Sequence, residues 1–145
     1  MRALGLGSSL SKGRVGELLL AHALGHKLIV GDKGADAVDG DGRRYEYKVS
    51  DDDQYNFFFG KWRAPETIEQ YLTAKFRHYE GSYCALTRET AIVRIVYIPM
   101  THLLPTLVAH LRTVKEGAAL QKNHGGLDAV LRLPGATEVP VPAPG

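Results

Sequence analysis

Residues 34–50 read GADAVDGDGRRYEYKVS, and this stretch predicts a β-hairpin. Asp-Gly pairs are strong turn signals, and here the DGDG run separates two segments that can form strands. Side chains alternate along a strand, so Glu46 and Lys48 share one face while Tyr47 between them points to the other. The stretch therefore predicts a carboxylate and an ammonium side by side on the second strand.

The register of the hairpin decides whether a second carboxylate joins this face. A three-residue loop over 39–41, followed by Gly42 in the left-handed bulge conformation, makes Asp36 the partner of Arg44. Asp36 then lies diagonally across from Glu46, with about 7–8 Å between the Cα atoms. A two-residue loop would turn Asp36 to the other face, so this prediction requires the bulged hairpin.

Asp36, Glu46 and Lys48 form a set whose chemistry suits a divalent cation. Proteins hold Mg²⁺ with one or two carboxylates, and water and substrate phosphate complete its coordination. A metal held in this way polarises a phosphoryl oxygen and generates a hydroxide nucleophile. The segment therefore predicts metal-dependent phosphodiester cleavage, with Mg²⁺ as cofactor and Mn²⁺ able to replace it. The alternative is a solvated strand face on which Glu46 and Lys48 form an ordinary surface pair.

The spacing Asp-x(9)-Glu-x-Lys on paired strands, after a helix that carries Glu17, resembles the PD-(D/E)xK nuclease superfamily. Restriction endonucleases, archaeal Holliday-junction resolvases and several repair nucleases belong to this superfamily. The resemblance implies that Asp36 and Glu46 bind Mg²⁺. It also implies that Lys48 orients or activates the attacking water.

The likeness covers residues 11–50 and departs from the motif name at Ala35, which stands in place of Pro. In the superfamily a Glu of the first helix often faces the metal, so the resemblance gives this role to Glu17. The residues themselves predict that helix, because Ser11 is a suitable N-cap and the apolar stripe ends at Gly25. The helix dipole also favours a Glu in the first turns, so a structural role for Glu17 stays open.

Polar and basic residues after the hairpin are candidate DNA contacts. Lys and Arg bind phosphates, while Gln and Asn can pair with adenine and Arg with guanine. The candidates are Gln54, Asn56, Lys61, Trp62 and Arg63. The alternative is that the aromatic run 57–59 packs in the core and the two amides are only solvated. The polar loop 121–126 is likewise either a DNA contact or a simple connection.

The apolar pattern predicts a single α/β (α+β) domain over residues 1–133, a mixed β-sheet flanked by helices with a restriction-endonuclease-like core. The expected order is helix, hairpin, strand, helix, strand, strand, helix. The later strands are expected over 54–59, 82–87 and 92–98, and the last helix over 104–112. Residues 134–145 are rich in Pro and predict a flexible or extended tail.

Composition limits the class of protein. A chain of 145 residues that is 44% hydrophobic and 23% charged is typical of a globular domain. A net charge of +2 neither requires nor excludes a nucleic-acid partner. The single Cys84 excludes an intrachain disulfide and fits a reducing compartment. There is no signal peptide and no apolar run of transmembrane length, so we expect a cytoplasmic protein without a membrane partner.

We therefore expect a Mg²⁺-dependent endodeoxyribonuclease, most similar to a small type II restriction enzyme that cuts double-stranded DNA. The chain is short and carries a DNA-contact-like segment after the motif. Cutting two strands with one site per chain favours a two-fold homodimer. The alternatives are a Holliday-junction resolvase, which would recognise junction shape, and a non-catalytic DNA-binding module on the same fold.

Overall fold

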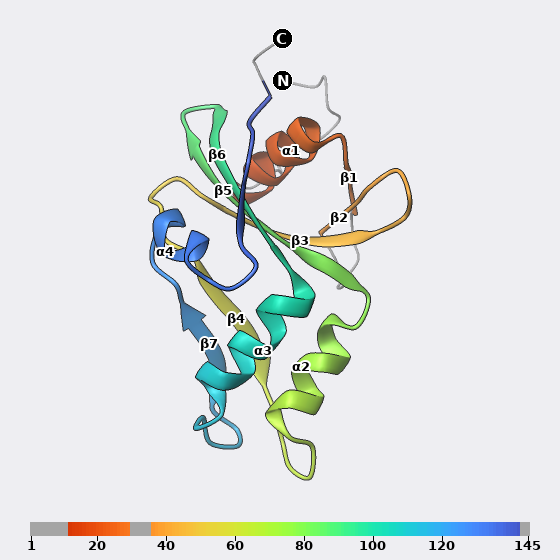
Figure 1. Ribbon diagram of the computed structural model, residues 1–145, viewed down its shortest axis with the longest axis vertical. Helices are drawn as coiled ribbons and strands as arrows, with labels where there is room; N and C mark the ends of the chain where they lie inside the picture. Colours follow the sequence, from red (N-terminus) through yellow and green to blue (C-terminus); the bar gives the residue numbers. More distant parts are fainter. Residues whose placement is uncertain (1–11, 30–35, 143–145) are drawn as a thin grey trace.

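The computed structural model describes residues 12–29 and 36–142, and it forms a mixed α/β fold (Figure 1). The helices are α1 (Lys12–Leu24), α2 (Ile68–Phe76), α3 (Met100–Leu111) and α4 (Leu127–Leu131). The strands are β1 (Lys27–Leu28), β2 (Ala37–Val38), β3 (Arg44–Ser50), β4 (Asn56–Lys61), β5 (Tyr79–Arg88), β6 (Ala91–Pro99), β7 (Ala119–Asn123) and β8 (Thr137–Val139). In the described ranges, no helix has the length and apolar character needed to span a membrane.

Most strands belong to one antiparallel-rich sheet. Its six strands follow the order β1-β2-β3-β5-β6-β8, while β4 and β7 form a separate two-stranded sheet. Only β3 and β5 pair in parallel among these strands, and α2 lies in the connection between them. The prediction of a mixed sheet flanked by helices is confirmed. The predicted order of elements holds through α3 except for β1, a two-residue strand between α1 and the hairpin that was not predicted.

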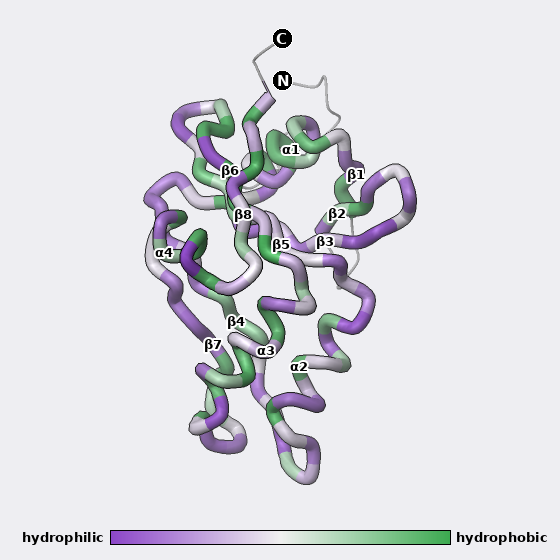
Figure 2. The backbone as a smooth tube through the Cα atoms, viewed as in Figure 1, coloured by the Kyte–Doolittle hydropathy of each residue, from purple (hydrophilic) through white to green (hydrophobic). Residues whose placement is uncertain are grey.

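The six-stranded sheet separates two hydrophobic cores. On one face, Leu20 and Ala21 of α1 pack with Tyr45 and Tyr47. The other face carries the larger core, built from α2, α3, α4 and the inner side of β4 and β7. Figure 2 shows hydrophobic residues concentrated in the helices and central strands, and a hydrophilic hairpin loop. Because side chains alternate on β3, its other residues, Glu46 among them, face the larger core.

The β2–β3 hairpin has a wider turn than the sequence predicted. Val38 pairs with Arg44, so residues 39–43 form the connection. The predicted pairing of Asp36 with Arg44 is therefore wrong by two positions. A shift of two keeps every side chain on its predicted face, so Asp36 moves closer to the level of Glu46 without changing sides.

The side chain of Asp39 explains the wider turn. Its carboxylate accepts hydrogen bonds from the backbone N–H groups of Asp41 and Arg43, both at 2.9 Å, and from the Tyr45 hydroxyl at 2.8 Å. Gly42 has a φ of 83°, the left-handed conformation that the sequence predicted for it. Asp39 thus stabilises the turn through its side-chain hydrogen bonds, and the Asp-Gly-rich composition of this loop is explained by turn formation.

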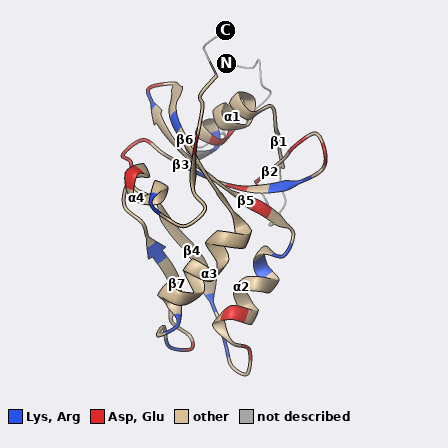
Figure 3. Ribbon diagram, viewed as in Figure 1, with Lys and Arg blue, Asp and Glu red and all other residues tan. Residues whose placement is uncertain are grey.

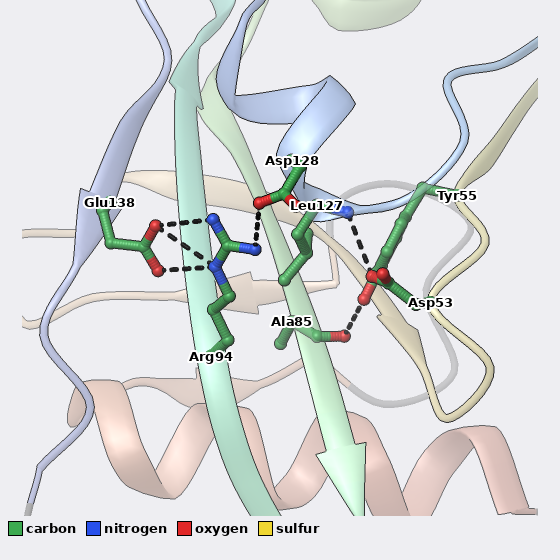
Figure 4. A network of polar contacts seen from close by, with 7 residues as sticks. All are labelled: Asp53, Tyr55, Ala85, Arg94, Leu127, Asp128 and Glu138. Atoms are coloured by element: carbon green, nitrogen blue, oxygen red, sulfur yellow. Dashed lines mark hydrogen bonds and ion pairs between the residues drawn. The ribbon is translucent and has the colours of Figure 1, made fainter.

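The elements after α3 were not expected from the sequence. β8 lies antiparallel to β6 at the edge of the sheet, inside the segment expected to be a flexible or extended tail. Arg94 of β6 joins both C-terminal elements, binding Glu138 of β8 at 3.0 Å and Asp128 of α4 at 2.7 Å (Figure 4). One guanidinium therefore ties β8 and α4 to the sheet.

Candidate metal-binding and catalytic site

Three of the four predicted site residues, Asp36, Glu46 and Lys48, lie on one face of the hairpin, and Glu17 lies on the helix that packs on the opposite face of β3. Asp36 immediately precedes β2, Glu46 and Lys48 lie on β3, and Glu17 lies on α1. Burial raises the pKa of each of the three carboxyls, and the Asp36 charge raises the pKa of Glu17 and Glu46 further. The Lys48 ammonium opposes the rise in all three. Asp36 and Lys48 are thus within electrostatic reach of both Glu17 and Glu46.

Asp36 is held by the backbone of β3. Its Oδ2 accepts a hydrogen bond from the N–H of Tyr47 at 2.9 Å, and its own N–H donates to the carbonyl oxygen of Tyr45 at 3.0 Å. The carboxylate therefore occupies a position in the β2–β3 ladder that a backbone carbonyl would normally fill. Burial raises the pKa of Asp36, while the Tyr47 N–H and the Lys48 ammonium limit the rise. Its orientation is set before any ligand arrives.

Glu46 has the most strongly perturbed carboxyl of the site. Its Oε1 is buried and has no hydrogen-bond partner within the described chain. Burial raises the pKa of Glu46 to about 7, and the Lys48 ammonium only partly offsets this effect. Near neutral pH the group is therefore poised between its acid and its carboxylate, and a cation beside it would hold it ionised.

Lys48 shares the face of Glu46. Its Nζ lies 5.4 Å from the centre of the Phe57 ring, a cation–π contact that directs the ammonium along the inner side of β4. Cys84 is its register partner on β5 and is fully buried. Burial raises the pKa of the Cys84 thiol to about 12, so the cysteine is not a nucleophile at neutral pH.

The helix that carries Glu17, α1, packs closely on the face of β3 opposite Glu46. A Cβ atom on Gly16 would lie 2.6 Å from Cγ1 of Val49, so only glycine allows this approach. Glu17 itself binds Arg14, with 2.7 Å between Oε1 and Nη1. Burial and the neighbouring Asp36 charge raise the pKa of Glu17, and Arg14 opposes them. Glu17 is thus within electrostatic reach of Asp36 and is tethered to its own helix by Arg14.

Lys75 is a charged neighbour that sequence reasoning did not assign. It lies in the last turn of α2, and its charge lowers the pKa of Glu46, although burial dominates that pKa. No sequence spacing connects the two residues. Lys75 comes near Glu46 because α2, in the connection between β3 and β5, belongs to the larger core on the side to which Glu46 points.

The DNA-contact candidates do not form a single cluster. Gln54 and Asn56 are exposed at the start of β4, whereas Lys61 and Arg63 are exposed at its other end. At about 3.3 Å per residue, roughly 17 Å separates Asn56 from Lys61. Trp62 packs against the larger core, and its Nε1 is buried without a partner among the described residues.

The aromatic run divides between the core and solvent. Phe57 and Phe59 are buried, which confirms the core interpretation for these two rings. Phe58 points the other way and is 55% exposed. Gln54 and Asn56, on the solvent side, are exposed as the solvated alternative predicted, and this exposure is also what a DNA contact requires.

The carboxylates of Asp36 and Glu46 offer the oxygen donors that Mg²⁺ prefers. In the part of the chain that the structure describes, no group of three or more His, Cys, Asp or Glu side chains is arranged to hold a metal. The fit therefore depends on Asp36 and Glu46, of which the second has a buried oxygen without a partner. One or two carboxylates, completed by water and phosphate, are the usual protein ligands of Mg²⁺.

Comparisons with known proteins leave the site to be interpreted from its own residues. No protein-family model matches the chain, and no curated protein shows significant similarity to it.

Proposed function

We propose that this protein is a Mg²⁺-dependent endodeoxyribonuclease that hydrolyses phosphodiester bonds. The proposal is carried by the convergence of Asp36, Glu46 and Lys48, in which a backbone-fixed carboxylate and a buried carboxyl meet an ammonium. Burying carboxylates without a compensating partner costs free energy. A functional cation site gives a reason for a chain to maintain such an arrangement.

The carboxylates would hold the metal. Asp36 and Glu46 would ligate Mg²⁺, and Glu17 would assist from α1, directly or through water. When bound, the ion supplies Lewis-acid polarisation of the phosphoryl oxygen and lowers the pKa of water. Because the Tyr47 N–H occupies Oδ2 of Asp36, the carboxylate is already oriented and its Oδ1 is the oxygen presented to a ligand.

Lys48 would act on the attacking water. Its ammonium can donate hydrogen bonds that position the water near the scissile phosphate, and it can help to remove the proton from that water. The contact of Nζ with the Phe57 ring restricts where the ammonium can lie. Lys48 therefore provides orientation and positive charge at the point where negative charge develops.

The arrangement of elements supports the interpretation as a PD-(D/E)xK nuclease. The carboxylate-bearing hairpin follows the helix that carries Glu17, and a crossover helix then leads to the strand beside β3. This is the order of elements expected for a restriction-endonuclease-like core. The glycine-dependent packing of α1 on β3 supports a role for the helix close to the hairpin.

Within this class we favour a type II restriction endonuclease that cuts double-stranded DNA as a homodimer. With one site per chain, a two-fold dimer is the simplest assembly that cuts both strands. Oxygen ligands of this kind also accept Mn²⁺, which we expect to replace Mg²⁺. The one cysteine, Cys84, fits a reducing compartment, so we propose a cytoplasmic location.

A digestion experiment with three substrates tests the function. Supercoiled plasmid, linear duplex and a four-way junction are incubated with the protein in Mg²⁺, in Mn²⁺ and in EDTA. Discrete duplex fragments that require metal support a restriction enzyme, and cleavage confined to the junction indicates a resolvase. DNA binding without metal and without cleavage of any substrate would contradict the nuclease and indicate a binding module.

A further inference from the structure

The two-stranded β4–β7 sheet, called the ribbon below, presents a row of amide side chains to solvent. Asn56 pairs with Asn123, and Phe58 pairs with Gln121. All four side chains are exposed, on the side of the ribbon that faces away from the core. Phe58 lies between the amides and is 55% exposed, one of the most exposed large hydrophobic residues in the described chain.

The inner side of the ribbon is fixed to the core. Phe59 and Leu120 are buried, and the Tyr71 hydroxyl of α2 donates to the carbonyl oxygen of Phe59 at 2.7 Å. At the other end of β4, the Tyr55 hydroxyl donates to the carbonyl oxygen of Ala85 at 2.8 Å (Figure 4). The ribbon is therefore anchored near both ends, and a rigid element of this kind can hold side chains in the geometry that base recognition needs.

The outward amides are available to an external partner. Within the described residues, the side chains of Asn56 and Gln121 make no hydrogen bond. Oδ1 of Asn123 accepts the N–H of Gly125 at 2.8 Å, which orients this amide and leaves its NH₂ group as a donor. An Asn or Gln amide can bind adenine through paired donor and acceptor bonds, and an apolar side chain can contact the thymine methyl group.

The dimensions of the ribbon fit a DNA groove. Strands in a pair lie about 4.8 Å apart, and the major groove of about 12 Å admits a two-stranded ribbon. Side chains two residues apart on one strand are separated by about 7 Å, which equals two base-pair steps of about 3.4 Å. The outward face therefore matches a short run of two or three base pairs.

Basic residues stand at the end of the ribbon where phosphates would lie. Figure 3 shows Lys and Arg at the end of β4, on β7 and in the loop between α3 and β7. Lys61, Arg63 and Lys115 are exposed in this region. The nearby Glu116 is engaged by the backbone N–H of Ala64 at 2.8 Å. Phosphate contacts of this kind set register on a duplex, while base-edge contacts carry sequence information.

We propose that the ribbon reads A·T base pairs in the major groove of double-stranded DNA. The proposal rests on the nuclease function proposed above, because it identifies the surface that would choose the cleavage site. It also connects candidates that are distant in sequence, since the register pairs Asn56 with Asn123, in the segment 121–126 that was predicted to be a loop and whose first three residues belong to β7. The ribbon adjoins the site through Phe57, whose ring contacts Lys48 and whose chain neighbours Asn56 and Phe58 face outward.

Selection from a library of random duplexes tests the proposal. The Lys48→Ala protein is used with Ca²⁺ so that bound DNA is not cut, and a bound motif with A·T pairs is expected. Adding Asn56→Ala or Gln121→Ala should lower the preference at one position by roughly 5- to 150-fold. Thr113→Ala, exposed in the turn after α3, is the matched control and should leave the motif unchanged.

A phosphate-contact variant separates affinity from specificity. Lys61→Met should weaken binding to all sequences about equally and reduce the salt slope by about one unit, without changing the motif. The substituted side chains, Asn56, Lys61, Thr113 and Gln121, are all exposed. Their variants should therefore keep the melting temperature of the parent protein.

Two results would overturn the ribbon proposal. One is a motif that persists unchanged in both amide variants, and the other is tighter binding of single-stranded DNA or RNA than of duplex. Failure of the nuclease function looks different. In that case the protein with Lys48 intact would not cleave in Mg²⁺, yet the motif would still depend on Asn56 and Gln121, which supports the ribbon as a reading surface.

Discussion

The Asp36 carboxylate accepts a hydrogen bond from the backbone N–H of Tyr47, with 2.9 Å between Oδ2 and the nitrogen. This bond makes the candidate metal ligand a member of the β2–β3 ladder. One oxygen of the carboxylate is committed to the fold, and the other is left for a ligand. The structural and the chemical roles of Asp36 can therefore be separated by substitution.

Two substitutions of Asp36 should differ in stability and agree in activity. Asp36→Asn keeps an oxygen that can accept the Tyr47 N–H, so its free energy of unfolding should remain close to that of the wild type. Asp36→Ala leaves that N–H unpaired and should cost about 1–3 kcal/mol. Urea denaturation measures the difference, and both variants should lose metal-dependent cleavage. Equal destabilisation of both variants would contradict the role of this hydrogen bond.

Glu46→Gln should stabilise the metal-free protein at alkaline pH. Burial raises the folded-state pKa of Glu46 from 4.5 to about 7, so the fold favours the neutral acid. The corresponding stability is complete below pH 4.5 and is lost as the pH rises through 7. In EDTA, the advantage of Glu46→Gln over the wild type should grow across this range, up to about 3 kcal/mol at pH 8.

Magnesium should reverse that comparison. Added Mg²⁺ should raise the melting temperature of the wild type at pH 8 by binding to the folded state, and it should have little effect on Glu46→Gln. Thermal unfolding with and without the ion measures both proteins. An advantage of Glu46→Gln that does not vary with pH would show that the carboxyl of Glu46 is not perturbed.

His124 should make the fold sensitive to acid. The ring is buried, its edge packs on Phe57 with 4.8 Å between ring centres, and its Nε2 has no partner among the described residues. Burial, with help from Lys122 and His110, lowers the pKa of His124 to about 4 from 6.5. The folded state therefore binds fewer protons than the unfolded state between these values.

The consequence is a loss of stability as the pH falls from 6.5 to 4. The loss due to His124 should be at most about 3 kcal/mol, and His124→Gln, which does not titrate, should remove that part of the pH dependence. Chemical denaturation at pH 7, 5.5 and 4 measures it. Parallel pH profiles for the two proteins would contradict a neutral buried imidazole.

Gly16→Ala should destabilise the protein although alanine favours helices. The new methyl group would meet Cγ1 of Val49, and overpacking of this kind costs about 1–3 kcal/mol, more than the roughly 1 kcal/mol gained in helix propensity. Because α1 would shift on β3, Glu17 would move and cleavage should slow. Adding Val49→Ala makes room and should restore part of the loss. A double variant no better than Gly16→Ala would show that the contact is unimportant.

The strands and faces of the hairpin could be predicted because they depend on local rules. Asp-Gly turn chemistry and two-residue alternation indicate where Glu46 and Lys48 point. The register could not be predicted, because the side chain of Asp39 competes with the backbone for the hydrogen bonds of the turn. The Tyr47 N–H bond to Asp36 and the approach of Lys75 are tertiary features without a spacing signature.

The C-terminal elements show a different limit. The segment 119–123, which forms β7, is mostly polar and shows little alternation of polar and apolar residues. Among its residues, only Leu120 is buried in the core. β8 is short and lies in a Pro-rich segment, where Arg94 and Glu138 stabilise the pairing through side chains. Such elements depend on a partner strand, so composition alone indicates a loop or a tail. That Asn56 and Gln121 lie on the same face of neighbouring strands follows only from the pairing of β4 with β7.

The rate of duplex cleavage under single-turnover conditions tests the central claim most directly, with wild type, Lys48→Met and Lys27→Met compared in Mg²⁺. Lys27 is exposed on β1, so its substitution is the matched control for loss of a lysine charge. We expect Lys48→Met to slow cleavage by about 10²- to 10⁴-fold, Lys27→Met to match the wild type, and EDTA to abolish cleavage in all three. Wild-type protein that is folded yet cuts no duplex in Mg²⁺, or Lys48→Met that cuts as fast as the wild type, would contradict the account.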